Sequence, residues 1–166
     1  MKIVTKDKLI NLAELVRLSV RARLVRDSPL DEKVARIQWA WIRPHDERGR
    51  RVKIAGNATP NRVGLNWSFF RNPDYLEEFE ETVRHELAHV MQFHVEKIYT
   101  IGGKPHHGAV WWRLYKLVGG KHKKHYHNLT LMPETPREEA LRKRAKLRWQ
   151  LNRLDTISEE EEIYGC

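Results

Sequence analysis

Cysteine is nearly absent from this chain of 166 residues, whose one cysteine is Cys166. A single thiol cannot form a disulfide within the chain, so no disulfide framework can hold this fold together. Zinc ribbons and other structural zinc sites built from several thiolates are excluded for the same reason. Cys166 could add at most one thiolate to a metal site, so any such site must be built mainly from other side chains.

Long apolar runs are also missing, and no stretch approaches the roughly 20 residues that a membrane-spanning helix requires. The first residues, Met1 to Asp7, run into charged side chains rather than into the apolar centre of a signal peptide. We therefore expect a soluble, intracellular and cytoplasmic protein that makes no membrane contact. A monomer is expected as well.

Acidic residues are fewer than basic ones. The chain has 31 Lys and Arg against 22 Asp and Glu, a formal net charge of +9, and a sequence pI near 9.8. This excess favours polyanionic partners, with nucleic acid the first candidate. The length indicates one domain with extensions, large enough to bury a single core.

The most informative segment that is present reads His85-Glu86-Leu87-Ala88-His89. Two imidazoles four residues apart on a helix project from the same face, so both can reach one metal ion. Glu86 turns toward the same pocket but is displaced from the pair, which suits it as a general base on a zinc-bound water. We interpret the motif as a catalytic Zn²⁺ site; the alternative is two surface histidines on an ordinary helix.

The surroundings of the motif support this interpretation. The segment Tyr75 to His94 contains neither glycine nor proline, and its apolar residues recur at helical spacing, at Phe79, Val83, Leu87 and Val90. The motif is thus predicted to lie on an amphipathic helix.

A catalytic zinc usually takes three protein ligands and leaves a fourth position for water. A glutamate from a following helix is a poor candidate, because no acidic residue lies between Glu96 and Glu134. The HExxHxxGxxH extension is excluded, because Gln92 and Val95 occupy its glycine and histidine positions. The remaining candidates are the neighbours His106-His107, in a loop that enters a helix.

The rest of the pattern predicts an α+β fold, in which an N-terminal helix and a small three-stranded antiparallel sheet precede the motif helix. A ligand helix and a basic C-terminal helix are predicted to follow it. The expected helices cover residues 6–26, 75–94, 111–118 and 135–154, and the expected strands cover 36–41, 52–55 and 62–67, with a turn at 57–61. We divide the chain into a domain at 1–120, a basic loop and helix at 121–156, and a disordered acidic tail at 157–166.

Three short segments occur in the order found in one protein family. Ala55 to Ala58 and Val63 to Phe70 precede the motif helix, and His107-Gly108, followed by Trp111, comes after it. Together with the HExxH motif they resemble the SprT/Spartan metalloprotease domain, most specifically over residues 52–112. The resemblance implies a minimal zincin-like fold and a zinc-dependent endopeptidase acting on DNA-associated or DNA-crosslinked proteins. It also implies that His107 is the third zinc ligand and that His106 is its neighbour in the pocket.

The chain departs from many members of that family at its C-terminal end, where it has no cysteine zinc ribbon and a basic region instead. This region is expected to contact nucleic acid through Lys121, Lys123, Lys124, Arg142, Lys143, Arg144, Lys146 and Arg148. The alternative for the helix is a solvated helix packed through its leucines and Trp149. The alternative for residues 121–127 is a second metal site or a solvated loop.

Other roles stay open in the sequence. The oxyanion of a tetrahedral intermediate could be stabilised by His106, Arg113 or Tyr115, and the sequence does not choose between them. Core packing, rather than stacking on nucleic-acid bases, is expected of Trp39, Trp41, Trp111 and Trp112. The competing function is a DNA-binding or regulatory module with a structural zinc, but such a site has no need of Glu86.

Overall fold

A computed structural model describes residues 3–97, 107–121 and 129–164, with side chains as far as Arg153. It divides into two compact units, which are each discontinuous in sequence. The first unit comprises Met1–Ile42 and Ile54–Met132, and the second comprises Arg43–Lys53 and Pro133–Cys166. The expected domain at 1–120 stays a prediction; within it, Arg43–Lys53 belong to the second compact unit.

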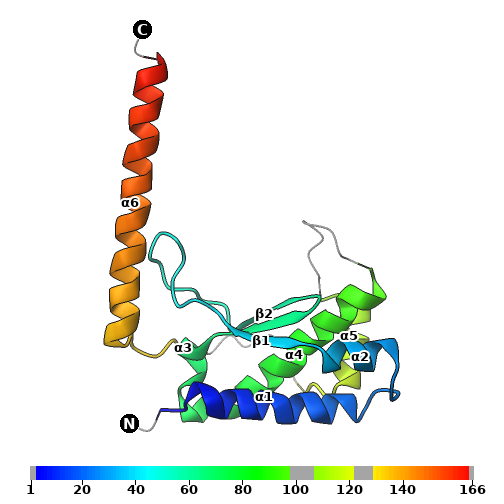
Figure 1. The fold of residues 1–166 in the computed structure, drawn as a ribbon. Coiled ribbons are helices and arrows are strands. Elements are labelled where there is room, and N and C mark those ends of the chain that lie inside the picture. Colours follow the sequence, from blue (N-terminus) through cyan, green and yellow to red (C-terminus); the bar gives the residue numbers. More distant parts are fainter. Residues whose placement is uncertain (1–2, 98–106, 122–128, 165–166) are drawn as a thin grey trace. The chain divides into compact units, whose positions relative to one another are not determined.

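The first unit combines helices with a small sheet (Figure 1), which confirms the α+β class. Helices α1 and α2 begin at side-chain caps, because Thr5 accepts from the amide of Lys8 and Ser28 accepts from the amide of Asp31. The elements in chain order are α1 (Lys6–Arg21), α2 (Pro29–Ala35), β1 (Gln38–Trp41), β2 (Gly56–Thr59), β3 (Arg62–Leu65), α3 (Trp67–Phe70), the 3₁₀ helix η1 (Pro73–Tyr75), α4 (Leu76–Val95) and α5 (Ala109–Leu117).

The sheet has the strand order β1-β3-β2 and is mixed. Strands β2 and β3 form an antiparallel hairpin, but β1 is parallel to β3, with Trp39 opposite Val63 and Trp41 opposite Leu65. The prediction of an antiparallel sheet was wrong, because alternation along one strand gives no information about the direction of its neighbour.

Strand β2 also begins four residues later than the expected strand at 52–55. The apolar residues Val52 and Ile54 suggested a strand. The amide of Val52 instead donates to the carbonyl of Pro44, within the second unit, at 3.0 Å. The pairing with β3 starts only at Gly56, opposite Leu65.

Helix α4 lies at the centre of the first unit and contacts α1, α2, α5 and the hairpin strands. The predicted apolar stripe at Phe79, Val83, Leu87 and Val90 is completely buried. Trp111 is buried as well, and Trp39, Trp41 and Trp112 are partly buried against the same core, which confirms their expected packing role. The HExxH motif therefore lies on the central, largely buried helix of the unit.

The second unit consists of the loop 43–53 and helix α6 (Pro136–Tyr164). Glu134 joins them, because His45 Nε2 lies 2.7 Å from its Oε1 and Arg142 donates to its Oε2 at 3.1 Å. Helix α6 begins with a reciprocal capping box between Thr135 and Glu138, as the sequence predicts.

Helix α6 continues to Tyr164 and so includes most of the tail that we expected to be disordered. Its leucines do not form a packed stripe, since Leu141, Leu147 and Leu151 are all exposed. Among the described residues, no helix is both long and apolar enough to cross a membrane.

Candidate metal centre

Three imidazole nitrogens converge at one point of the first unit. His85 and His89 project from successive turns of α4, and His107 lies just before α5, whose N-cap is Gly108. Their Nε2 atoms form a nearly equilateral triangle, with separations of 3.2 Å (His85 to His89), 3.0 Å (His89 to His107) and 3.1 Å (His85 to His107). The structure thus brings together the three residues expected to be zinc ligands.

The donor set fits a tetrahedral Zn²⁺ ion. Zinc bonds imidazole nitrogen at about 2.0–2.1 Å, which places two ligand nitrogens of an ideal tetrahedron about 3.3 Å apart. The observed separations are only slightly shorter, and these histidines are the one group with metal-ligand spacing in the part of the chain that the structure describes. His89 is buried whereas His107 is exposed, so the centre is accessible from the side of His107.

Glu86 lies beside this centre with only 6% of its surface exposed. Desolvation by burial raises the pKa of its carboxyl group to about 8 from an ordinary value of 4.5. A cation held by the neighbouring histidines would lower this pKa again by direct attraction. The carboxylate is therefore placed where its proton affinity can be adjusted into the neutral range, as a general base requires.

A glycine makes room for this carboxylate. A Cβ atom added to Gly56 of β2 would lie 2.8 Å from Glu86 Oε1 and 2.9 Å from the Thr82 methyl carbon, closer than real Cβ contacts. Strand β2 can therefore pass directly over Glu86 only because residue 56 has no side chain.

An aromatic pair supports the histidines. The Trp111 ring centroid lies 4.7, 5.4 and 4.5 Å from those of His85, His89 and His107. The ring of Tyr115 stacks on Trp111, with centroids 4.7 Å apart and an interplanar angle of 14°. Both aromatic residues come from α5, so this helix positions the histidines from α4 as well as its own neighbour, His107.

The hydroxyl group of Tyr115 donates to the fully buried carboxylate of Glu81 at 2.7 Å. Glu81 also accepts from the amide of Lys121 at 2.9 Å and from Arg84 at 2.9 Å. The phenolic proton is thus engaged on the side of Glu81, which makes Tyr115 a support of the site in this conformation rather than a donor to a reacting oxygen.

The other two candidates for oxyanion stabilisation differ in what the structure shows of them. Arg113 is exposed and lies two residues from both Trp111 and Tyr115, so the helical repeat turns it away from the histidines. His106 lies outside the described residues.

The residues expected to contact nucleic acid fall in both units. Lys121 belongs to the first unit, where its ammonium group lies 3.7 Å from Glu77, and Lys123 and Lys124 lie outside the described residues. The remaining candidates all lie on α6 in the second unit, namely Arg142, Lys143, Arg144, Lys146 and Arg148.

Several contributing residues were not predicted from the sequence. Gln92 contacts His89 three residues before it, and Glu81 lies four residues before His85. A spacing of three or four residues from a ligand on a helix could have predicted both residues from the sequence. The closeness of Gly56 to Glu86 had no such signal, because it depends on how the strand crosses the helix.

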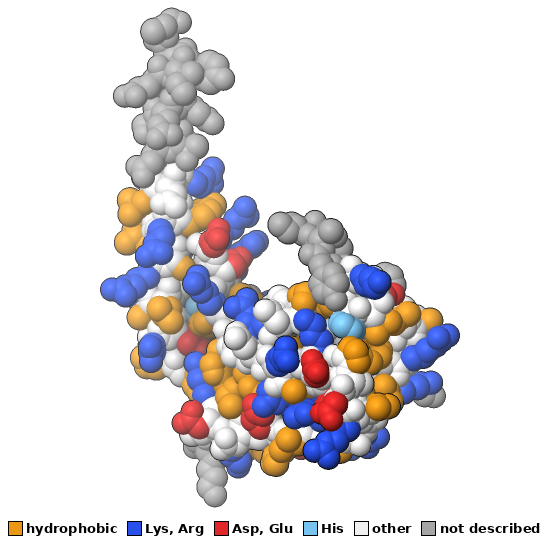
Figure 2. Space-filling model, turned by 45° about the vertical axis from the view of Figure 1, so that its right-hand side comes forward, with side chains coloured by type: hydrophobic (Ala, Val, Ile, Leu, Met, Phe, Trp, Pro, Cys, Tyr) orange, Lys and Arg blue, Asp and Glu red, His pale blue; other side chains and the backbone are white. Residues whose placement is uncertain are grey.

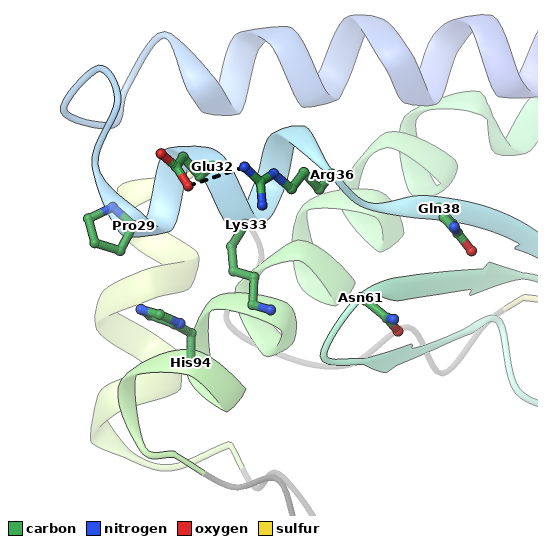
Figure 3. Close-up of a pocket in the computed structure, with 7 residues that line it drawn as sticks. All are labelled: Pro29, Glu32, Lys33, Arg36, Gln38, Asn61 and His94. Carbon is green, nitrogen blue, oxygen red and sulfur yellow. Dashed lines mark ion pairs between the residues drawn. The ribbon is translucent and has the colours of Figure 1, made fainter.

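The described surface also has an open groove of about 570 Å³ away from this centre (Figure 3). It lies between α2, the start of β1, the β2–β3 turn and His94 near the end of α4, and Glu32 and Arg36 on its wall form an ion pair at 3.6 Å. None of the three converging histidines lines it. Its wall combines charges of both signs without a convergent donor set, so the metal centre is the better candidate site.

Comparison with protein-family models, curated proteins and solved structures finds no match to this chain in any of the three.

Proposed function

We propose that this protein is a zinc-dependent endopeptidase of the SprT-like type. The observation that carries the proposal is the convergence of three histidine Nε2 atoms next to the buried carboxylate of Glu86. A purely structural zinc site is normally closed by four protein ligands and needs no adjacent base. An accessible three-histidine centre with a glutamate beside it is suited to hydrolysis.

Bound by His85, His89 and His107, zinc would polarise the scissile carbonyl group and make water acidic enough to lose a proton near neutral pH. Glu86 takes the proton of the attacking water and transfers it to the leaving amine. Burial shields this carboxylate from bulk water, and the absence of a side chain at Gly56 leaves it space beside strand β2.

The sheet offers a place for an extended peptide. Strand β2 lies at one end of the strand order, and its first residue, Gly56, lies against Glu86. A substrate segment that adds to the edge of β2 away from β3 would bring a peptide bond close to the general base. This arrangement favours a polypeptide substrate over a small amide.

The second unit supports a nucleic-acid partner. Its residues 43–53 and 133–153 contain twelve Lys and Arg but only five Asp and Glu. Three of these acids pair with basic side chains, namely Asp46 with Arg50, Glu139 with Lys143, and Glu134 with His45 and Arg142. Figure 2 shows blue Lys and Arg side chains along the described part of α6. Such a surface fits a phosphate backbone, and the proposed substrates are proteins bound or crosslinked to DNA.

The test combines metal analysis with proteolysis. The purified full chain is expected to bind one zinc ion and to cleave a DNA-binding protein, with cleavage compared in the presence and absence of single-stranded DNA. Glu86→Gln should retain zinc, fold and DNA binding but lose cleavage by a factor of at least about 10². Stoichiometric zinc without cleavage of any substrate would favour the binding-module alternative, and absence of zinc would overturn both.

A further inference from the structure

We infer that Gln92 is a positioning residue of the metal centre, which holds the His89 ring in the tautomer and orientation that zinc requires, and that Glu96 in turn orients Gln92. The inference rests on the proposed metal site. It concerns residues outside the HExxH motif and the third ligand.

Gln92 lies one helical turn after His89 on α4 and is completely buried. Its Oε1 atom lies 3.0 Å from His89 Nδ1, which is the ring nitrogen that does not face the other histidines. Its Nε2 atom donates to Glu96 Oε2 at 2.7 Å. The three side chains thus form a hydrogen-bonded series that ends at the candidate ligand.

The direction of this series follows from the chemistry of its members. An ionised carboxylate can only accept hydrogen bonds, so the Glu96 carboxylate selects the NH₂ group of the Gln92 amide. The amide oxygen of Gln92 then faces His89 and can only accept, which requires a proton on Nδ1. In a neutral imidazole with Nδ1 protonated, the lone pair is on Nε2, the atom 3.2 and 3.0 Å from the matching nitrogens of His85 and His107.

An alternative role for Gln92 would be purely structural, as a satisfied polar residue in the core. The two roles differ in what they affect. A structural glutamine would change the free energy of unfolding, whereas a positioning glutamine changes metal affinity and the tautomer of His89 in a protein that is still folded. Loss of such an outer hydrogen bond typically weakens metal binding by about 10–100-fold.

The experiment measures the zinc Kd of the full chain by competition with a chromophoric chelator, together with the visible spectrum after Co²⁺ substitution. Gln92→Met keeps the side-chain length but replaces the amide oxygen with a sulfur that is only a weak acceptor, and about 10–100-fold weaker zinc binding is expected. Glu96→Leu changes a half-buried residue, so it keeps the inference testable should the first variant fold poorly, and a smaller loss of affinity is expected. Gln38→Met, at an exposed position on β1, is the matched control and should bind zinc as the wild type does.

A compensating pair makes the test specific. In the double variant Gln92→Glu with Glu96→Gln, the new carboxylate accepts from Nδ1 and the new amide donates to it, so most of the affinity lost in Gln92→Met should be retained. The ¹⁵N shifts of the histidine rings in the metal-free protein should show the Nδ1–H tautomer for His89 in the wild type and this pair, but not in Gln92→Met. Wild-type zinc affinity and an unchanged Co²⁺ spectrum in a folded Gln92→Met would overturn the inference. A wild-type protein that binds no zinc would instead overturn the metal site itself.

Discussion

Glu86 is subject to two opposing influences at the scale of a single residue. Burial disfavours its charged form, whereas a cation at the three neighbouring nitrogens would favour it. Its protonation is therefore expected to depend on whether the centre holds metal, which makes the residue a sensitive reporter of occupancy.

This dependence gives a pH prediction for the metal-free protein. The folded-state pKa of Glu86, about 8, is raised above the ordinary value of 4.5, so its contribution to stability is complete below pH 4.5 and is lost as the pH rises toward 8. The free energy of unfolding should fall over this interval by up to about 1.4 kcal/mol per pH unit relative to Glu86→Gln. Denaturant unfolding of both metal-free proteins at several pH values measures the difference. If the free energies of unfolding of the two proteins changed with pH in parallel, the pKa of Glu86 would not be raised in the folded protein.

Gly56 permits a second prediction for a single residue. Gly56→Ala places a methyl carbon 2.8 Å from Glu86 Oε1, so either the carboxylate or strand β2 must move. We expect a stability loss of about 1–3 kcal/mol and a fall in proteolysis of at least about tenfold, with zinc content unchanged because no ligand is touched. Thermal unfolding, metal analysis and a protease assay test the three parts. Full activity in this variant would mean that the strand does not define the position of the base.

At the scale of the element, α5 links the three converging histidines to the core. Trp111 contacts all three histidine rings and is 2% exposed, whereas its neighbour Trp112 is only partly buried. Trp111→Ala should destabilise the fold by about 3–5 kcal/mol and weaken zinc binding. Trp112→Ala, the matched control, should cost less in stability and leave the zinc Kd near that of the wild type. Equal effects of the two substitutions on zinc affinity would contradict the supporting role of Trp111.

The element scale also shows how far the sequence could be interpreted. The apolar stripe on 75–94 and the capping signal at Thr135 predicted helices correctly, because both are local patterns that the helix repeat determines. The direction of β1 and the start of β2 could not be predicted, since both depend on pairing partners distant in sequence. His85 and His89 were grouped by helical spacing, but the convergence of His107 required the packing of α5 on α4.

At the scale of the whole molecule, the proposed partner can be tested through salt dependence. Arg144, Lys146 and Arg148 on α6 form no ion pair with an acidic side chain among the described residues. Replacing all three with glutamine should weaken DNA binding and lower the slope of log K against log salt by about 2–3. Replacing Lys8, Arg23 and Arg26 of the first unit removes the same charge and serves as the control. Binding measured by fluorescence anisotropy over a range of salt concentrations distinguishes the two; identical slopes would place the DNA contact elsewhere.

The chain enters the second unit twice, first at Arg43–Lys53 and again after Pro133. No single cut of the polypeptide can therefore separate the units into two intact fragments. A truncation before Glu134 would leave His45 behind without the carboxylate that it contacts at 2.7 Å. Excision of residues 43–53 would require a new connection between β1 and β2, beside the strand that passes over Glu86. Modular exchange of the basic helix between proteins would thus require two coordinated grafts, one internal and one terminal.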